Sequence, residues 1–125
     1  MFNHFLDEIN AQNNIPLIAW GAGYYYNLLS DFLKSIGVKY IYDKKWQDII
    51  IDEFDGLRVI SDDEIRDNKN KIIIICILDI GVASELKNKL EKELNNASIY
   101  LLRDLSPIGR IISKDEILDN SNKGV

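Results

Sequence analysis

Four consecutive isoleucines, at positions 72–75, constrain the fold of this chain more than any other feature of its sequence. Successive side chains of a strand point to opposite faces of a sheet, so an unbroken β-branched run needs apolar cover on both faces. Strands of this kind lie at the centre of parallel sheets, between layers of helices. The run therefore predicts a central parallel strand over residues 72–77 of an α/β protein.

Shorter apolar segments before and after this run alternate with helical patterns. Short runs of apolar and β-branched residues predict four further strands, at 17–20, 38–42, 58–60 and 99–102,. Apolar residues recur at helical spacing over 28–36 and 82–94, and Ser61 with Glu64 has the spacing of a capping box,. This alternation predicts an open, mostly parallel α/β sheet of about five strands with helices on both faces. We expect the 17–20 and 72–77 strands to be central neighbours.

The same pattern divides the chain into three parts. Its 125 residues suit one domain,. We predict a short amphipathic helix in residues 1–14, the α/β domain in 15–105 and a separate C-terminal segment in 106–125. In that last segment Ser113 and Glu116 repeat the capping-box spacing,.

A glycine-containing turn joins the first predicted strand to the helix that follows it. Gly21 and Gly23, with Ala22 between them, are typical of the turn with which dinucleotide-binding folds hold a phosphate against the backbone,. Asp43 follows Gly23 by about 20 positions, at the end of the second strand, where an acidic residue can accept hydrogen bonds from ribose hydroxyls,. The spacing favours a nucleotide-type ligand, its phosphate on the backbone amides of residues 21–24 and its ribose on Asp43.

The third glycine of the G-x-G-x-x-G pattern is absent, because position 26 is tyrosine. That glycine lets helix and strand pack closely, so the Tyr26 ring must either push them apart or swing outwards. A ring lying across the amides at the helix start would exclude a ligand. The alternative hypothesis is that Gly21 and Gly23 make only a turn and that Asp43 merely ends a strand.

Further side chains flank these positions. Tyr24 and Tyr25 could stack on a base or sugar, or could pack at the helix start. Asp79 follows the central strand, where it could meet a ligand at the carboxyl edge of the sheet or cap the next helix. The predicted ligand site comprises Gly21, Ala22, Gly23, Tyr24, Tyr25, Asp43, Lys44, Trp46 and Asp79.

Three segments carry a resemblance to a known group of domains: Ile-Ala-Trp-Gly-Ala-Gly at 18–23, Tyr-Ile-Tyr-Asp-Lys-Lys-Trp at 40–46 and Asp-Gly-Leu-Arg-Val-Ile-Ser at 55–61. Over residues 15–102 the chain resembles the Rossmann-like domain at the N-terminus of bacterial sugar O- and N-acetyltransferases of the left-handed β-helix type. It also resembles the domain found beside FkbM-type methyltransferases. The resemblance implies a Rossmann-like sheet in which Gly21, Gly23 and Asp43 line a pocket for NAD(P) or a UDP-sugar. It also implies a partner enzyme of surface-polysaccharide or sugar-modifying biosynthesis.

No set of residues for catalytic turnover is recognised, so the sequence favours a binding module over an enzyme. Tyr40 and Lys44 have the spacing of a short-chain dehydrogenase pair, but that pair requires a helix and these positions fall at a strand end. His4 is the single histidine and Cys76 the single cysteine, which leaves no metal-binding cluster of the usual spacing,. Cys76 also falls in the most apolar segment, where burial disfavours a nucleophilic thiolate.

Charge and composition argue against several classes of partner. Fifteen Lys and Arg residues oppose 20 Asp and Glu, a net charge of −5, so the dense basic face that binds nucleic-acid phosphates is not expected,. The apolar run at 72–78 is far shorter than the roughly 20 residues that span a bilayer,. The first 14 residues lack the basic start and apolar core of a secretory signal, and a single cysteine suits a reducing compartment,. We expect a cytoplasmic protein with neither nucleic-acid nor membrane partners.

Three hypotheses for the function follow. The first is a module that binds a nucleotide, dinucleotide or nucleotide sugar. The second is a structural or interaction domain that keeps the fold without a ligand, as the tyrosine at position 26 suggests. The third, which the sequence supports less, is a small enzyme that assembles its site across subunits. A homodimer, through an edge strand or the final segment, is compatible with either of the first two.

Overall fold

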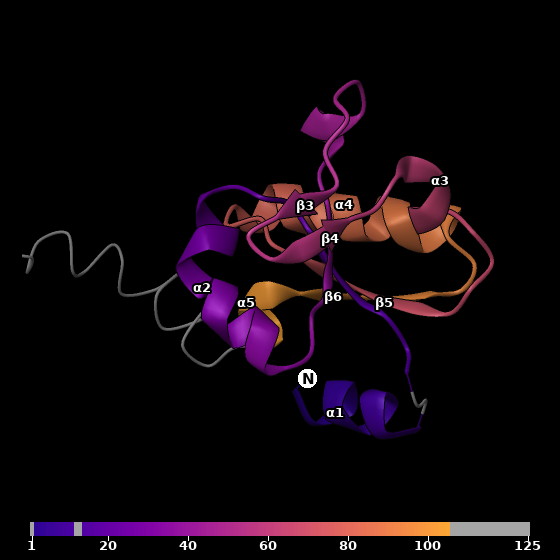
Figure 1. Ribbon diagram of the computed structural model, residues 1–125. Coiled ribbons are helices and arrows are strands. Elements are labelled where there is room, and N and C mark those ends of the chain that lie inside the picture. The colour runs from indigo at the N-terminus through magenta and orange to yellow at the C-terminus, as the bar shows by residue number, and fades with distance from the viewer. Residues whose placement is uncertain (1, 12–13, 106–125) are drawn as a thin grey trace, which may run out of the picture.

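The computed structural model describes residues 2–11 and 14–105, which form a layered α/β structure (Figure 1). The predicted C-terminal segment 106–125, with Ser113 and Glu116, lies outside the described residues. In chain order the elements are α1 (Phe2–Ala11), β1 (Leu17–Trp20), α2 (Tyr24–Ser35), β2 (Tyr40–Tyr42), the 3-10 helix η1 (Lys44–Trp46), β3 (Glu53–Phe54), β4 (Leu57–Val59), α3 (Asp62–Ile65), β5 (Lys71–Ile75), α4 (Ile80–Glu93), β6 (Ala97–Leu101) and α5 (Leu102–Leu105). None of the helices in these residues is both long enough and apolar enough to cross a bilayer.

The six strands form one sheet in the order β3-β4-β2-β1-β5-β6. β3 pairs antiparallel with β4, and every other pair of neighbours is parallel. Without β3, the parallel strands run third, second, first, fourth, fifth in chain order, as in doubly wound dinucleotide-binding folds,. The predicted open, mostly parallel Rossmann-like sheet is therefore confirmed, with β1 and β5 as central neighbours. The sixth strand is the short β3, which lies in a segment without a periodic pattern.

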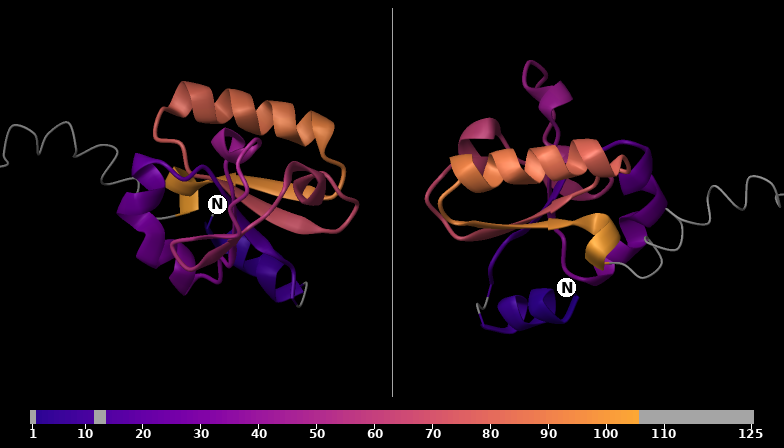
Figure 2. Two further views of the ribbon diagram at one scale, coloured as in Figure 1. Left: turned by 45° about the horizontal axis from the view of Figure 1, so that its top comes forward. Right: turned by 180° about the vertical axis from the view of Figure 1, so that it is seen from behind.

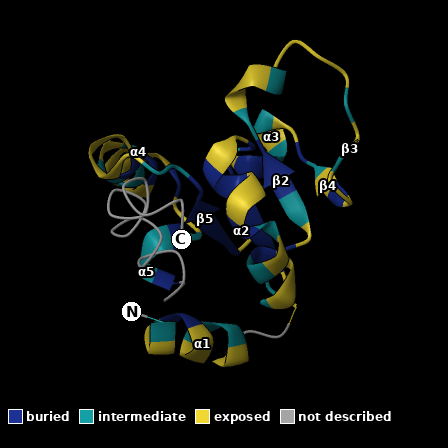
Figure 3. Ribbon diagram, turned by 90° about the vertical axis from the view of Figure 1, so that its left-hand side faces the viewer, coloured by how far each residue is buried: buried dark blue, intermediate teal, exposed yellow. Residues whose placement is uncertain are grey.

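Helices cover both faces of this sheet, as the isoleucine run requires (Figure 2). All four isoleucines of β5 are fully buried, and Figure 3 shows this strand dark blue between the helical layers. Ile72 and Ile74 belong to a core that includes residues of α1, α2 and α5. Ile73 and Ile75 belong to a second core with residues of α3 and α4. The alternation along β5 thus fills one core on each face of the sheet.

The N-terminal helix α1 is fixed to the sheet by both apolar and polar contacts. Phe5 is fully buried, and its ring lies edge-on against the ring of Tyr100 with the centroids 5.1 Å apart. The carboxylate of Glu8 accepts hydrogen bonds from the hydroxyls of Ser98 and Tyr100 in β6. Burial and the Glu8 carboxylate together raise the pKa of Tyr100. The helix predicted in residues 1–14 thus contributes to the core beneath the sheet.

Lys71 is the one buried charged residue among those described, and it closes the loop between α3 and β5. Its ammonium group donates to the carbonyl oxygen and the carboxylate of Asp67, both at 2.9 Å, and to the carbonyl oxygen of Lys69 at 2.7 Å. Each of its three protons therefore has an acceptor. Lys71→Met keeps the apolar stem but removes all three bonds, and we expect the free energy of unfolding to fall by about 2 kcal/mol.

Urea denaturation measures this loss, and Lys69→Met is the matched control. The Lys69 side chain is exposed in the same loop, so its replacement should change the free energy of unfolding by less than about 0.5 kcal/mol,. Equal effects of the two substitutions would contradict a structural role for the Lys71 ammonium group.

Candidate functional site

The predicted ligand site lies at the carboxyl edge of the sheet, where β1 and β5 end side by side. From this edge the chain crosses in opposite directions, through α2 from β1 to β2 and through α4 from β5 to β6. Loops that diverge in this way leave a crevice between them, and ligands of open α/β sheets bind at such a switch point. The glycine turn follows β1 and Asp79 follows the end of β5, so the fold brings both to this edge.

Gly21 makes the tight turn at the end of β1. Its φ of +110° lies in a region that residues with a Cβ rarely adopt,. A Cβ at this position would lie 3.2 Å from the carbonyl oxygen of Cys76, at the end of the neighbouring central strand. The Gly21 N–H donates to the carbonyl oxygen of Tyr42 at 2.8 Å, which extends the pairing of β1 with β2. Both the backbone conformation and the close approach therefore require glycine.

Asp43 fixes the glycine turn from the end of β2. Its Oδ2 accepts a hydrogen bond from the Ala22 N–H at 2.8 Å, and its Oδ1 accepts one from the Lys45 N–H at 2.9 Å. The second bond caps η1. The Asp43 side chain remains 17% exposed, and each carboxylate oxygen has a further lone pair for a donor,. The residue predicted to hold ribose thus lies beside the glycine turn. The N–H groups of Gly21 and Ala22, two of the amides predicted to hold phosphate, instead donate to Tyr42 and Asp43 within the protein.

Gly23 stands at the start of α2 and faces open space. It is the N-cap residue, in an extended conformation and with no side chain to cap the helix. A Cβ added here would meet nothing within 4 Å. A helix start carries a partial positive charge, so this position combines room for a ligand with a favourable potential for an anion.

The three tyrosines at the start of α2 lie in different surroundings. Tyr24 is 60% exposed, whereas Tyr25 is buried and its ring packs in the core beneath the sheet. Tyr26 is fully buried, its hydroxyl donates to Asp55 at 2.7 Å, and its ring packs 5.8 Å from that of Phe54. The ring at position 26 is thus directed towards the β3–β4 hairpin and away from the glycine turn. Of the three rings, only that of Tyr24 is accessible to a ligand.

Asp79 and Lys44, two further residues of the predicted ligand site, lie outside the glycine turn. Asp79 is the N-cap residue of α4, and its Oδ1 accepts a hydrogen bond from the Val82 N–H at 3.1 Å. The structure thus gives Asp79 the capping role that was the alternative to ligand contact. Lys44 is exposed in η1, and Tyr40 is in β2, so these two residues do not share a helix. Cys76 is buried and burial raises the pKa of its thiol, which keeps it in the unreactive protonated form,.

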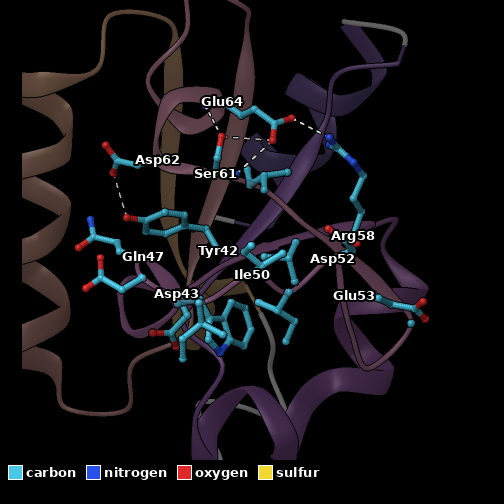
Figure 4. A pocket seen from close by; sticks show the side chains of 17 residues that line it. Tyr42, Asp43, Gln47, Ile50, Asp52, Glu53, Arg58, Ser61, Asp62 and Glu64 are labelled. Carbon is cyan, nitrogen blue, oxygen red and sulfur yellow. Dashed lines mark hydrogen bonds and ion pairs between the residues drawn. The ribbon is translucent and has the colours of Figure 1, made fainter.

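A cleft of about 1030 Å³ adjoins Asp43 at the carboxyl ends of β2 and β4 (Figure 4). It includes Trp46, whose ring packs against Phe54 with the centroids 5.1 Å apart. The lining of this cleft contains one basic side chain, that of Arg58, and six carboxylates. The carboxylates are those of Asp43, Asp48, Asp52, Glu53, Asp62 and Glu64. Such a lining repels phosphate and favours hydroxyl donors or cations.

Local hydrogen bonds arrange the inner wall of this cleft. The Ser61 capping box begins α3, and hydrogen bonds from the Ser61 backbone and from Arg58 lower the pKa of Glu64. The hydroxyl of Tyr42 donates to Asp62 at 2.9 Å, and burial together with this carboxylate raises the pKa of Tyr42. Sequence reasoning located the capping box but assigned no role to Tyr42, Asp62 or Arg58.

A chain of charged groups continues from this wall across α3 to α4. Asp62 accepts a hydrogen bond from Nε of Arg66 at 3.0 Å, and Nη1 of Arg66 donates to Glu93 at 3.0 Å. This network links the end of α3 to α4. Within residues 2–11 and 14–105, no three His, Cys, Asp or Glu side chains are placed so that they could share a metal ion.

The fold therefore brings together the glycine turn, the start of α2 and Asp43, with Tyr24 and Trp46 in accessible positions nearby. It directs Tyr25 into the core and uses Asp79 as a helix cap. No protein-family model matches this chain, and no curated protein and no solved structure matches it.

Proposed function

We propose that this domain binds a nucleotide-type ligand, either a dinucleotide such as NAD(P) or a nucleotide sugar such as a UDP-sugar. The observation that carries this proposal is the hydrogen bond from the Ala22 N–H to the Asp43 carboxylate, at 2.8 Å. This bond holds the glycine turn beside Asp43. In dinucleotide-binding folds, the corresponding turn contacts phosphate and the corresponding acidic residue contacts ribose. The order of the parallel strands supports the same proposal, because the glycine turn follows β1 beside the switch point between β1 and β5 and Asp43 follows the adjacent strand β2,.

The charges around the site favour one orientation of the ligand. Its phosphate would lie beside Gly23, where the start of α2 offers a positive potential and open space,. Its ribose hydroxyls would donate to the remaining lone pairs of Asp43. Its base or sugar would lie beside Tyr24 and Trp46. The carboxylates of the neighbouring cleft favour the uncharged, hydroxyl-bearing part of the ligand on that side,.

The proposed role is binding without turnover, in the service of a partner enzyme of surface-polysaccharide or sugar-modifying biosynthesis. The resemblance to domains of sugar-modifying enzymes supports this context, and the single cysteine favours the cytoplasm as the compartment,. A structural or interaction domain without a ligand is the second candidate. It is favoured by one observation: both oxygens of Asp43 already accept hydrogen bonds from the protein's own backbone.

A thermal-shift titration with NAD, NADP and UDP-glucose distinguishes the two candidates. A ligand present at about 100 times its dissociation constant adds about 2.7 kcal/mol to the stability of the folded state, which is a readily measured rise in Tm. The absence of a rise with any of these ligands, in a protein shown to be folded, would contradict nucleotide binding and favour the second candidate.

Gly23→Val tests the contact itself. The valine side chain would fill the open space at the start of α2, so we expect the affinity for the ligand to fall at least about tenfold,. Because a Cβ at Gly23 meets nothing within 4 Å, the free energy of unfolding should change by less than about 1 kcal/mol,. Isothermal titration calorimetry measures the affinity, and Asn27→Val, at an exposed position one turn further along α2, is the control. An unchanged affinity in Gly23→Val would exclude the glycine turn as the phosphate contact.

A further inference from the structure

Residues 44–52, here called the arm, project from the carboxyl edge of the sheet (top of Figure 1, and the right-hand view of Figure 2). The base of the arm is fixed at both ends. Asp43 accepts a hydrogen bond from the Lys45 N–H at 2.9 Å, and the Trp46 ring packs against Phe54. On the returning side, the Val59 N–H donates to the carbonyl oxygen of Asp52 at 2.9 Å. The arm is therefore held in a defined position by the body of the domain.

The tip of the arm exposes two adjacent isoleucines. Ile49 is 60% exposed and Ile50 is 98% exposed, whereas the isoleucines of β5 are fully buried. Single apolar side chains are common on protein surfaces, but a projecting apolar pair on an anchored loop is typical of an interaction site. Burial of these side chains against a partner removes apolar surface from water and stabilises a complex.

The surface beside the tip is acidic. Asp48 and Asp52 flank the isoleucines in the sequence, and Glu53, Asp62 and Glu64 continue the carboxylates along the cleft (Figure 4). The basic side chain of this lining, Arg58, is already paired with Glu64 at 2.9 Å. Asp62 is likewise paired with Arg66 at 3.0 Å. The carboxylates beside the tip that have no ion pair among the described residues are those of Asp48, Asp52 and Glu53, so the uncompensated charge there is negative and complementary to a cationic partner,.

We propose that the arm and the adjoining acidic cleft form a docking surface for a protein segment that carries Lys or Arg beside aliphatic side chains. The aliphatic side chains would cover Ile49 and Ile50, and the basic side chains would pair with the carboxylates of the cleft. Phosphates of nucleic acid or of anionic lipid would face those carboxylates and be repelled. A second copy of this chain, with a net charge of −5, offers poor complementarity,. The proposal does not rest on nucleotide binding, because Asp48, Ile50 and Asp52, the residues that its variants change, are not among those proposed to hold the nucleotide.

Selection from a phage-displayed library of random peptides tests this proposal on the full-length chain. We expect the enriched peptides to carry Lys or Arg next to Leu, Ile or Val. Fluorescence anisotropy then measures the affinity of the synthesised peptides. Ile50→Asp should weaken their binding at least about tenfold, and the double variant Asp48→Lys with Asp52→Lys should do the same. Binding should also weaken as the salt concentration rises.

Two matched variants control for general changes of surface. Val82→Asp introduces the same carboxylate at an apolar side chain that is 51% exposed on α4, and Asp63→Lys makes one of the two charge reversals on α3 outside the cleft. Both should leave the affinity within about twofold of the parent value.

Several results would overturn the proposal. One is a selection that does not enrich peptides with Lys or Arg next to aliphatic residues. Another is an affinity for the selected peptides that Ile50→Asp leaves unchanged. Self-association that Ile50→Asp abolishes, measured by sedimentation equilibrium, would instead identify a second copy as the occupant. Binding to anionic lipid vesicles that Ile50→Asp abolishes would identify a membrane surface instead.

Discussion

Tyr26→Gly, which completes the G-x-G-x-x-G pattern, is expected to lower the free energy of unfolding by about 4–6 kcal/mol. The Tyr26 side chain is fully buried and packs in the core beneath the sheet, so its removal leaves a large cavity. Truncation of a buried aromatic side chain to alanine costs about 3–5 kcal/mol, and glycine inside a helix adds roughly 1 kcal/mol. Urea denaturation measures the change. A loss below about 1 kcal/mol would contradict a core role for this ring.

Tyr26→Phe is the matched control, because it keeps the ring and removes only the hydrogen bond to Asp55. We expect it to cost about 1 kcal/mol at neutral pH. The hydrogen bond from Tyr26, followed by the effect of Lys34, lowers the pKa of Asp55. A carboxyl group whose pKa is lower in the folded state than in the unfolded state stabilises the fold above its unfolded pKa. That contribution is lost as the pH falls through the folded value.

The stability difference between the parent chain and Tyr26→Phe should therefore shrink as the pH is lowered below about 4, the ordinary pKa range of an aspartate. Urea denaturation of both proteins over a series of pH values measures this. A difference that stays constant down to the acid limit of folding would show that the charged form of Asp55 is not what the Tyr26 hydroxyl stabilises.

The architecture could be predicted from the sequence because burial on both faces leaves a direct mark on composition. An unbroken run such as Ile72–Ile75 is compatible with few environments other than a central parallel strand,. Once β5 is placed, the alternation of strands and helices and the handedness of crossovers leave few orders for the rest. The predicted neighbourhood of β1 and β5 follows from these rules and is observed.

The surroundings of Tyr26 could not be predicted, because its contacts come from a distant part of the chain. In the G-x-G-x-x-G pattern, position 26 is a contact between helix and strand. Here its ring packs against Phe54 and its hydroxyl donates to Asp55 in the β3–β4 hairpin. β3 has only two residues, too few to show any period, so neither the hairpin nor its packing against α2 was foreseeable,.

The hydrogen bonds by which Asp43 fixes the glycine turn and caps η1 could not be predicted, for a different reason. Its position about 20 residues after the glycine turn is visible in the sequence, but the groups that donate hydrogen bonds to its carboxylate are not,. The donors that it binds are backbone amides, of Ala22 and Lys45, and a backbone amide leaves no trace in the residue types. The exposure of the arm could not be predicted either. The apolar composition of its tip, at Ile49 and Ile50, is that of a buried segment, but both side chains are exposed in the structure.

Gly21→Ala is expected to lower the free energy of unfolding by about 2–3 kcal/mol. A φ of +110° is strained for any residue with a Cβ, which costs about 1–3 kcal/mol,. The new methyl group would also stand 3.2 Å from the Cys76 carbonyl oxygen, and the central strand that carries this oxygen has little freedom to move,. Gly23→Ala adds the same methyl group two residues later, where nothing lies within 4 Å, and should cost less than about 1 kcal/mol,. Urea denaturation compares the two variants. Equal losses would show that the turn tolerates a side chain at Gly21 and that neither its φ nor its approach to the Cys76 carbonyl oxygen requires glycine.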